Sequence, residues 1–174
     1  MRVRCDSAIV AVMRFQMRKQ IWSLRNTYAI RDADDSEVFR VTAKMWSIGA
    51  KLAFEDLAGR QLAFIQQRVM AFKPTYEIYR DGVLAATITR KVFSLRPHYD
   101  IEVSDGEPLA VDGDFTDHEY AITRAGSPIA VISMRWFALS DTYGVDVSDV
   151  EDPILALAIT VVLEMVDHHH RDSD

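Results

Sequence analysis

Five cations stand at regular intervals along the chain, each just before a pair of apolar residues, with Lys19 one residue further back. They are Lys19, Lys44, Arg68, Lys91 and Arg135. Cations that a fold gathers at one end of a domain attract an anionic group, such as a phosphate or a lipid headgroup. We therefore take Lys44, Arg68, Lys91 and Arg135 as candidate anion-binding residues. A second interpretation stays open, because cations beside strands also face solvent and protect strand edges.

Other residues that support catalysis or metal binding are present, but their spacing makes no recognisable site. The seven glycines form neither a P-loop nor a G-x-G-x-x-G motif, and no H-E-x-x-H or G-x-S-x-G is found. His98 and His118 occupy equivalent bends, and consecutive residues such as His168–His170 do not share one helix face. Asp32–Asp35 lacks the glycine and the closing glutamate of an EF-hand loop. We expect no catalytic, cofactor-binding or metal-binding residue.

Composition indicates one packed domain and excludes several classes of protein. The chain has 174 residues and is 49% hydrophobic, which is too apolar for a disordered chain. A net charge of −6 argues against nucleic-acid binding through bulk charge. A single cysteine, Cys5, excludes an internal disulfide and suits a reducing compartment. No signal peptide or transmembrane segment is recognised, so we expect a cytoplasmic protein, with peripheral membrane association left open.

A repeat of about 21–24 residues organises the chain. Its copies begin at Ile21, Met45, Val69, Val92, Gly113 and Trp136. Each copy has a polar bend, an alternating segment such as Tyr76-Glu77-Ile78-Tyr79, a turn and a second alternating segment, which is typical of two half-buried strands. Two strands in each of six copies predict about twelve antiparallel strands, and a sheet of that width favours closure into a barrel.

The turns inside the copies are acidic. Their acids are Asp32, Asp34, Asp35, Asp56, Asp81, Asp105 and Glu107. Asp81-Gly82 and Asp105-Gly106 are typical of type I′ hairpin turns, which need positive φ at both central residues. Because barrel strands run from end to end, the acids are expected at one rim and the cations at the other.

The last part of the chain breaks the repeat. Asp152 can cap a helix, Pro153 suits its first position, and Ile154–Leu163 follows without a charge. A helix that is apolar on all sides must be buried all round, so we place it inside the barrel, over about 152–167. We expect residues 168–174 to be a polar tail.

Several segments of the chain resemble the LURP-one-related family, which belongs with the Tubby C-terminal-like superfamily and is similar in fold to phospholipid scramblases. They are Trp46-Ser47-Ile48-Gly49, Phe72 to Ile78, Trp136 to Gly144 and Leu155 to Ile159. The likeness covers about residues 13–167. Chains of this family tend to begin near a sequence like Met13-Arg14-Phe15, so the resemblance implies that residues 1–12 are a disordered extension or precede the start. It implies a mainly β fold, a closed barrel of twelve strands around a central hydrophobic C-terminal helix. The family has no established catalytic residues.

The leading functional hypothesis is a non-enzymatic Tubby-like binding module. Its ligand would be a phosphoinositide, another anionic ligand or a protein partner. An enzyme with an unrecognised site in the barrel mouth, a scramblase-like lipid-associated protein and a structural scaffold are the alternatives. A pocket that gathers titratable groups with perturbed pKa would favour the enzyme.

Overall fold

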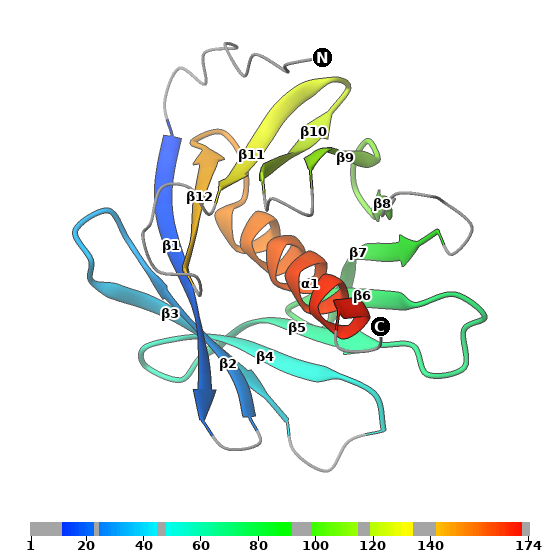
Figure 1. Cartoon of the computed structure of the whole chain (residues 1–174), viewed down its shortest axis with the longest axis horizontal. Coiled ribbons are helices and arrows are strands. Elements are labelled where there is room, and N and C mark those ends of the chain that lie inside the picture. The colour runs from blue at the N-terminus through cyan, green and yellow to red at the C-terminus, as the bar shows by residue number, and fades with distance from the viewer. Residues whose placement is uncertain are drawn as a thin grey trace.

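Twelve antiparallel strands close into a barrel around one helix in the computed structural model of the chain (Figure 1). The structure describes residues 12–22, 25–44, 48–91, 99–114, 119–133 and 142–171. The strands are β1 (Val12–Trp22), β2 (Arg25–Arg31), β3 (Glu37–Ala43), β4 (Lys51–Asp56), β5 (Gln61–Gln67), β6 (Thr75–Arg80), β7 (Val83–Arg90), β8 (Tyr99–Val103), β9 (Leu109–Asp114), β10 (Glu119–Arg124), β11 (Ser127–Ser133) and β12 (Thr142–Ser148), and the helix is α1 (Pro153–Arg171). The predicted fold class is confirmed.

Closure of the barrel uses a strand that the repeat did not predict. Each strand pairs with its sequence neighbours, and β1 also pairs with β12, with Phe15 opposite Val145. The sixth copy was expected to supply two strands, but it supplies only β12, because the chain then continues as α1. The twelfth strand is β1, which precedes the first copy. Without β1, the edges of β2 and β12 would expose unpaired backbone groups.

The two Asp-Gly turns differ in conformation. Asp81 and Gly82 have φ values of 50° and 79°, so the predicted type I′ geometry is confirmed at this turn. Neither Asp105 nor Gly106 has a positive φ, so the same prediction is wrong at the second turn. That connection occupies residues 104–108 between β8 and β9, and a longer connection does not require two left-handed residues.

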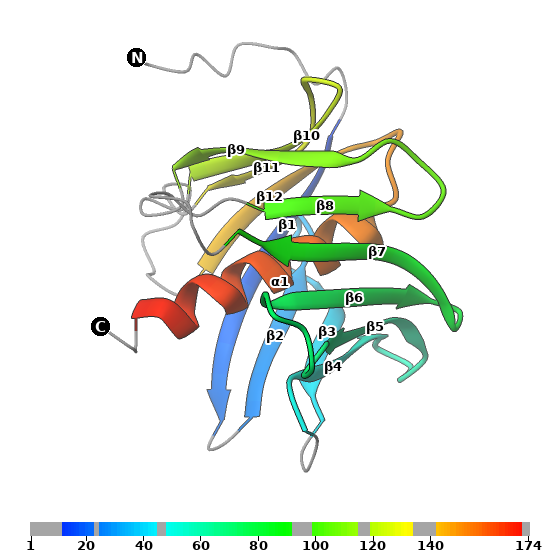
Figure 2. The ribbon, with the colours of Figure 1, turned by 90° about the vertical axis from the view of Figure 1, so that its right-hand side faces the viewer.

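The helix begins where the sequence predicts. Asp152 Oδ1 accepts hydrogen bonds from the backbone N–H groups of Ile154, at 2.9 Å, and Leu155, at 3.4 Å. Side chains from Ala156 to Val166 are all buried, as expected for a helix apolar on every side. The helical backbone continues to Arg171, beyond the expected end at Asp167, so the first part of the expected tail is helical instead. Figure 2 shows α1 passing through the barrel and emerging on the side where β6 begins.

The repeat produces two layers of buried side chains around α1. The first inward residues of the even-numbered strands are Tyr28, Leu52, Tyr76, Tyr99, Tyr120 and Tyr143, none more than 6% exposed. The next inward residues are Ile30, Phe54, Ile78, Ile101, Ile122 and Val145, none more than 1% exposed. Alternate residues of a strand face the same side, so this spacing of two explains the alternation in every copy.

Candidate functional site

The barrel has two rims. The acidic rim consists of the connections at residues 32–36, 57–60, 81–82, 104–108, 125–126 and 149–152, and the basic rim of the connections after β1, β3, β5, β7, β9 and β11. Lys44, Arg68 and Lys91 each directly follow a strand at the basic rim. Arg135 lies outside the described residues. Among the residues that are described, the acids of the predicted turns lie at the opposite rim, so the separation of charge expected from the repeat is present.

Three neighbouring connections of the basic rim form one surface without acids. They join β3 to β4, β5 to β6 and β7 to β8, and residues 41–54, 61–76 and 84–99 contain no Asp or Glu. Backbone hydrogen bonds join them: Gln67 N–H donates to Ala50 O at 2.8 Å, and Arg90 N–H to Pro74 O at 3.0 Å. We call the described residues of this surface, 44, 48–51, 67–75 and 90–91, the basic arc.

Each described candidate already contacts a neighbouring side chain. Lys44 Nζ lies 5.0 Å from the centre of the Phe64 ring, a cation–π distance. Arg68 Nε lies 3.4 Å from Glu77 Oε1, and Lys91 Nζ lies 2.9 Å from Asp100 Oδ1. The side chains of Arg68 and Lys91 remain 59% and 45% exposed, respectively. The structure therefore places the candidates on one arc, each with its own partner rather than in a shared pocket.

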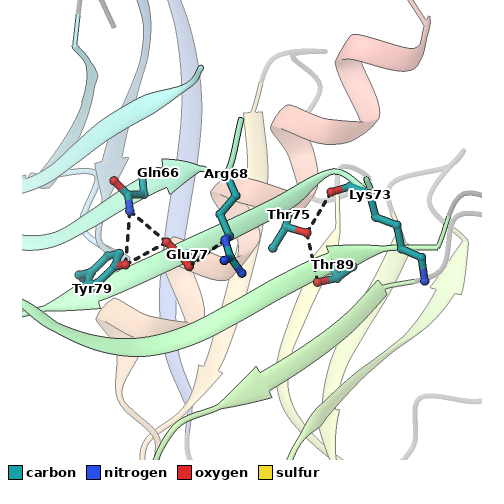
Figure 3. A network of polar contacts seen from close by, with 7 residues as sticks. All are labelled: Gln66, Arg68, Lys73, Thr75, Glu77, Tyr79 and Thr89. Atoms are coloured by element: carbon teal, nitrogen blue, oxygen red, sulfur yellow. Dashed lines mark hydrogen bonds and ion pairs between the residues drawn. The ribbon is translucent and has the colours of Figure 1, made fainter. Parts of the chain in front are cut away.

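Arg68 is held on the outer face of the barrel by a polar network (Figure 3). Tyr79 Oη and Gln66 Nε2 donate to Glu77 Oε2 at 2.9 and 3.0 Å, while Arg68 pairs with the other oxygen of Glu77. The bond to Glu77 raises the pKa of Tyr79, because it favours the protonated phenol. Both oxygens of Glu77 are thus engaged, which fixes the direction in which Arg68 leaves the strand.

Lys73 and Arg90 of the basic arc have no acidic partner among the described residues, and the sequence analysis missed both. Arg90 is the last residue of β7 and lies on the same, inner face of the strand as Ile88. In the pairing of β7 with β8 it stands opposite Tyr99. In the described part of the chain its Nε is buried without a hydrogen-bond partner. Lys73 is exposed in the connection before β6. The alternation of β7 was the signal that could have indicated Arg90, because it places residues 86, 88 and 90 on one side.

A buried carboxyl lies inside the barrel near the basic rim. Tyr120 Oη donates to Glu164 Oε1 at 2.7 Å, and both side chains are buried. Burial, and then the charge of Glu164, raise the pKa of Tyr28 and Tyr120. These phenols stay protonated near neutral pH, so they can donate hydrogen bonds but cannot act as bases.

Among known proteins, a family model described as LURP-one-related matches residues 13–164. The chain belongs to the LURP-one-related family.

Two known proteins are similar to this chain. The uncharacterised protein YxjI of Bacillus subtilis is 30% identical over 156 residues, which cover 90% of this LURP-one-related chain and 94% of YxjI. An X-ray structure of an Arabidopsis thaliana protein is 15% identical with a TM-score of 0.65, covering 88% of this chain and 91% of the other. At that identity the likeness shows the fold alone.

The described residues of this LURP-one-related barrel offer no group of three His, Cys, Asp or Glu that could hold a metal ion. Asp32 Oδ1 instead accepts the N–H groups of Asp34 and Ser36, both at 3.0 Å, so this carboxylate holds a turn. Cys5, His98 and His118 lie outside the described residues. No helix in the described part of the chain is long and apolar enough to cross a bilayer.

Proposed function

We propose that this LURP-one-related chain is a non-enzymatic binding module that holds an anionic ligand, such as a phosphoinositide headgroup, at its basic rim. The basic arc supports this proposal, because three adjacent connections carry cations and no acid. In a chain whose net charge is −6, this arrangement leaves a local positive field that attracts anions. Arginine and lysine both donate charge-assisted hydrogen bonds to phosphate oxygens.

The candidate cations would play different parts in binding. Arg68 and Lys91 are half exposed and each pairs with one acid, so a phosphate can accept from their remaining N–H groups. Arg90 offers a buried Nε without a partner in the described structure, which an anion at the mouth would satisfy. Lys44 and Arg135 complete the proposed set.

The test is a charge reversal at each rim. Arg68→Glu with Lys91→Glu should weaken binding to phosphoinositide vesicles by roughly tenfold or more, and added salt should weaken binding of the parent chain. The control is Arg31→Glu with Arg60→Glu at the acidic rim, which changes the net charge equally. Arg68→Gln with Lys91→Gln excludes an effect of repulsion at Glu77 and Asp100. Absence of binding by the parent chain at low salt, or an equal loss in the control, would contradict the proposal.

An enzyme with a site in the barrel mouth has less support. The titratable groups near Glu164 are tyrosines whose pKa is raised, whereas a general base needs a pKa near the working pH. We expect no hydrolysis of generic esters or phosphoesters. Turnover that disappears in His98→Ala or His118→Ala would favour the enzyme instead.

A further inference from the structure

Large apolar side chains are exposed together on the basic arc. Ile48 is 80% exposed, Val69 53%, Met70 96% and Phe72 108%. We call these four residues the apolar patch. Exposed apolar residues are common singly, but a group of them in one region marks a surface that binds something.

The patch belongs to two connections that touch each other. A Cβ on Gly49, whose φ is +76°, would lie 2.6 Å from Val69 Cγ2, so only glycine allows this approach. Ala50 N–H also donates to Gln67 Oε1 at 3.2 Å. Ile48 is therefore carried beside Val69, and the β3–β4 and β5–β6 connections present their apolar side chains from one surface.

Cations flank the patch and acids are absent from its two connections. Arg68 precedes Val69, Lys73 follows Phe72, and Lys44 and Lys51 bound the other connection. The exposed apolar residues of the acidic rim are placed differently, because Leu57 follows Asp56 and Val150 stands between Asp149 and Glu151. Apolar side chains ringed by cations match an anionic bilayer, where the apolar groups enter the interface and the cations stay among the headgroups.

We propose that the basic arc docks on the surface of an anionic bilayer, with Met70 and Phe72 entering the interface. The proposal rests on the proposed function, because the same cations meet the headgroups. Its new element is the apolar patch, which a soluble anion would not need.

The first experiment measures sedimentation with phosphatidylcholine vesicles, with and without phosphatidylserine. Met70→Ser with Phe72→Ser should lower partitioning onto the anionic vesicles about tenfold or more, since two large apolar side chains no longer leave water on docking. The control is Leu57→Ser with Val83→Ser, two exposed residues at the acidic rim. Unchanged partitioning in the patch variant, or an equal loss in the control, overturns the proposal.

A second arm separates docking from the proposed function. The patch variant should still bind soluble inositol hexakisphosphate in a salt-sensitive way. If the parent chain binds this anion but not the phosphatidylserine vesicles, docking fails and the proposed function stands. If it binds neither, both fail. Self-association of the parent that the patch variant loses, without vesicle binding, overturns docking in favour of a protein–protein surface.

A third arm reports the depth of the patch directly. The chain has one cysteine, so Cys5→Ser with Phe72→Cys allows a single environment-sensitive fluorophore. Its emission should shift to the blue with anionic vesicles, whereas a fluorophore at Leu57→Cys in the same background should not respond. A shift at both positions, or at neither, contradicts docking through the basic arc.

Discussion

Along the acidic rim arginines are paired with carboxylates, whereas along the basic arc Lys73 and Arg90 have no carboxylate partner in the described structure. The acidic-rim pairs are Arg31–Asp35, Arg60–Asp56, Arg80–Asp152 and Arg124–Glu151. Exposed pairs of this kind add little stability, but they cancel charge locally. The acidic rim thus balances part of its own charge, and the basic arc keeps positive charge available for a ligand.

Acids of the acidic rim also hold their own turns through hydrogen bonds from the backbone. Asp56 Oδ1 accepts the N–H groups of Ala58, at 3.0 Å, and Arg60, at 2.9 Å, and Asp32 holds its own turn in the same way. Such bonds close tight turns without any ligand. The difference teaches that turn formation accounts for these acids, while the exposed cations and apolar patch are what the proposed binding would use.

The largest loss of stability should come from removing the helix α1, which passes through the barrel between the two rims. Deleting residues 153–174 should leave no folded protein, and Ile159→Asp alone should destabilise by more than about 4 kcal/mol, because it buries an unpaired charge. Val150→Asp, at an 84% exposed site, is the control and should melt close to the parent chain. The measurement is thermal unfolding in detergent-free buffer. Cooperative melting of the truncated chain near the parent temperature would show that the barrel does not need its helix.

Two glycines, one at each rim, should lose different amounts of unfolding free energy when each is replaced by alanine. A Cβ on Gly113, on the β9 side of the basic rim, would lie 2.4 Å from Glu119 O and 2.6 Å from Tyr120 Cα. Gly82, at the acidic rim, has nothing within 4 Å of such a Cβ. Both have positive φ, so Gly82→Ala should cost about 1 kcal/mol and Gly113→Ala about 2–4 kcal/mol in the free energy of unfolding. Equal losses in urea titrations would mean that the backbone relaxes at Gly113.

Alkaline pH should lower the free energy of unfolding through the buried tyrosines inside the barrel near the basic rim. The folded-state pKa of Tyr28 and Tyr120 lies above the ordinary value of 10.0, so the folded state keeps protons that the unfolded chain loses. The free energy of unfolding should be constant below that value and fall as pH rises above it, by about 1.4 kcal/mol per pH unit for each such tyrosine. Tyr28→Phe should make the fall shallower in urea titrations followed across this range. The same slope in the parent chain and the variant would contradict this assignment.

Acid should lower the free energy of unfolding less than alkali does, and it should act through Asp56 at the acidic rim. The backbone N–H of Arg60 is the main cause that lowers the pKa of Asp56 below its ordinary value of 3.8, with further help from the Arg60 charge and the N–H of Ala58. The contribution of Asp56 to stability is therefore present above pH 3.8 and is lost as pH falls through the lower folded-state value. Asp56→Asn should slightly flatten the acid side of the stability profile and leave the alkaline side unchanged. A change on the alkaline side would break the assignment of opposite pH ranges to opposite rims.

The sequence alone predicted features that depend on short-range patterns. The spacing of two that places Tyr76 and Ile78 inward, the positive φ of Asp81-Gly82 and the Asp152 cap all follow from a few neighbouring residues. Repeated six times, the strand and turn patterns predicted a barrel and its two rims, and the apolar run after the Asp152 cap predicted the buried helix. They failed at Asp105-Gly106, where the length of the connection outweighed the turn motif.

Only the tertiary structure decided which distant parts of the chain meet. Closure by β1 depends on pairing residues at opposite ends of the chain, such as Phe15 and Val145, which no local pattern encodes. The approach of Gly49 to Val69 likewise depends on the register of β4 and β5. Charge separation follows from the repeat because alternate turns fall at alternate ends of the barrel. Whether each cation is neutralised depends on the side chains that the closed barrel brings beside it.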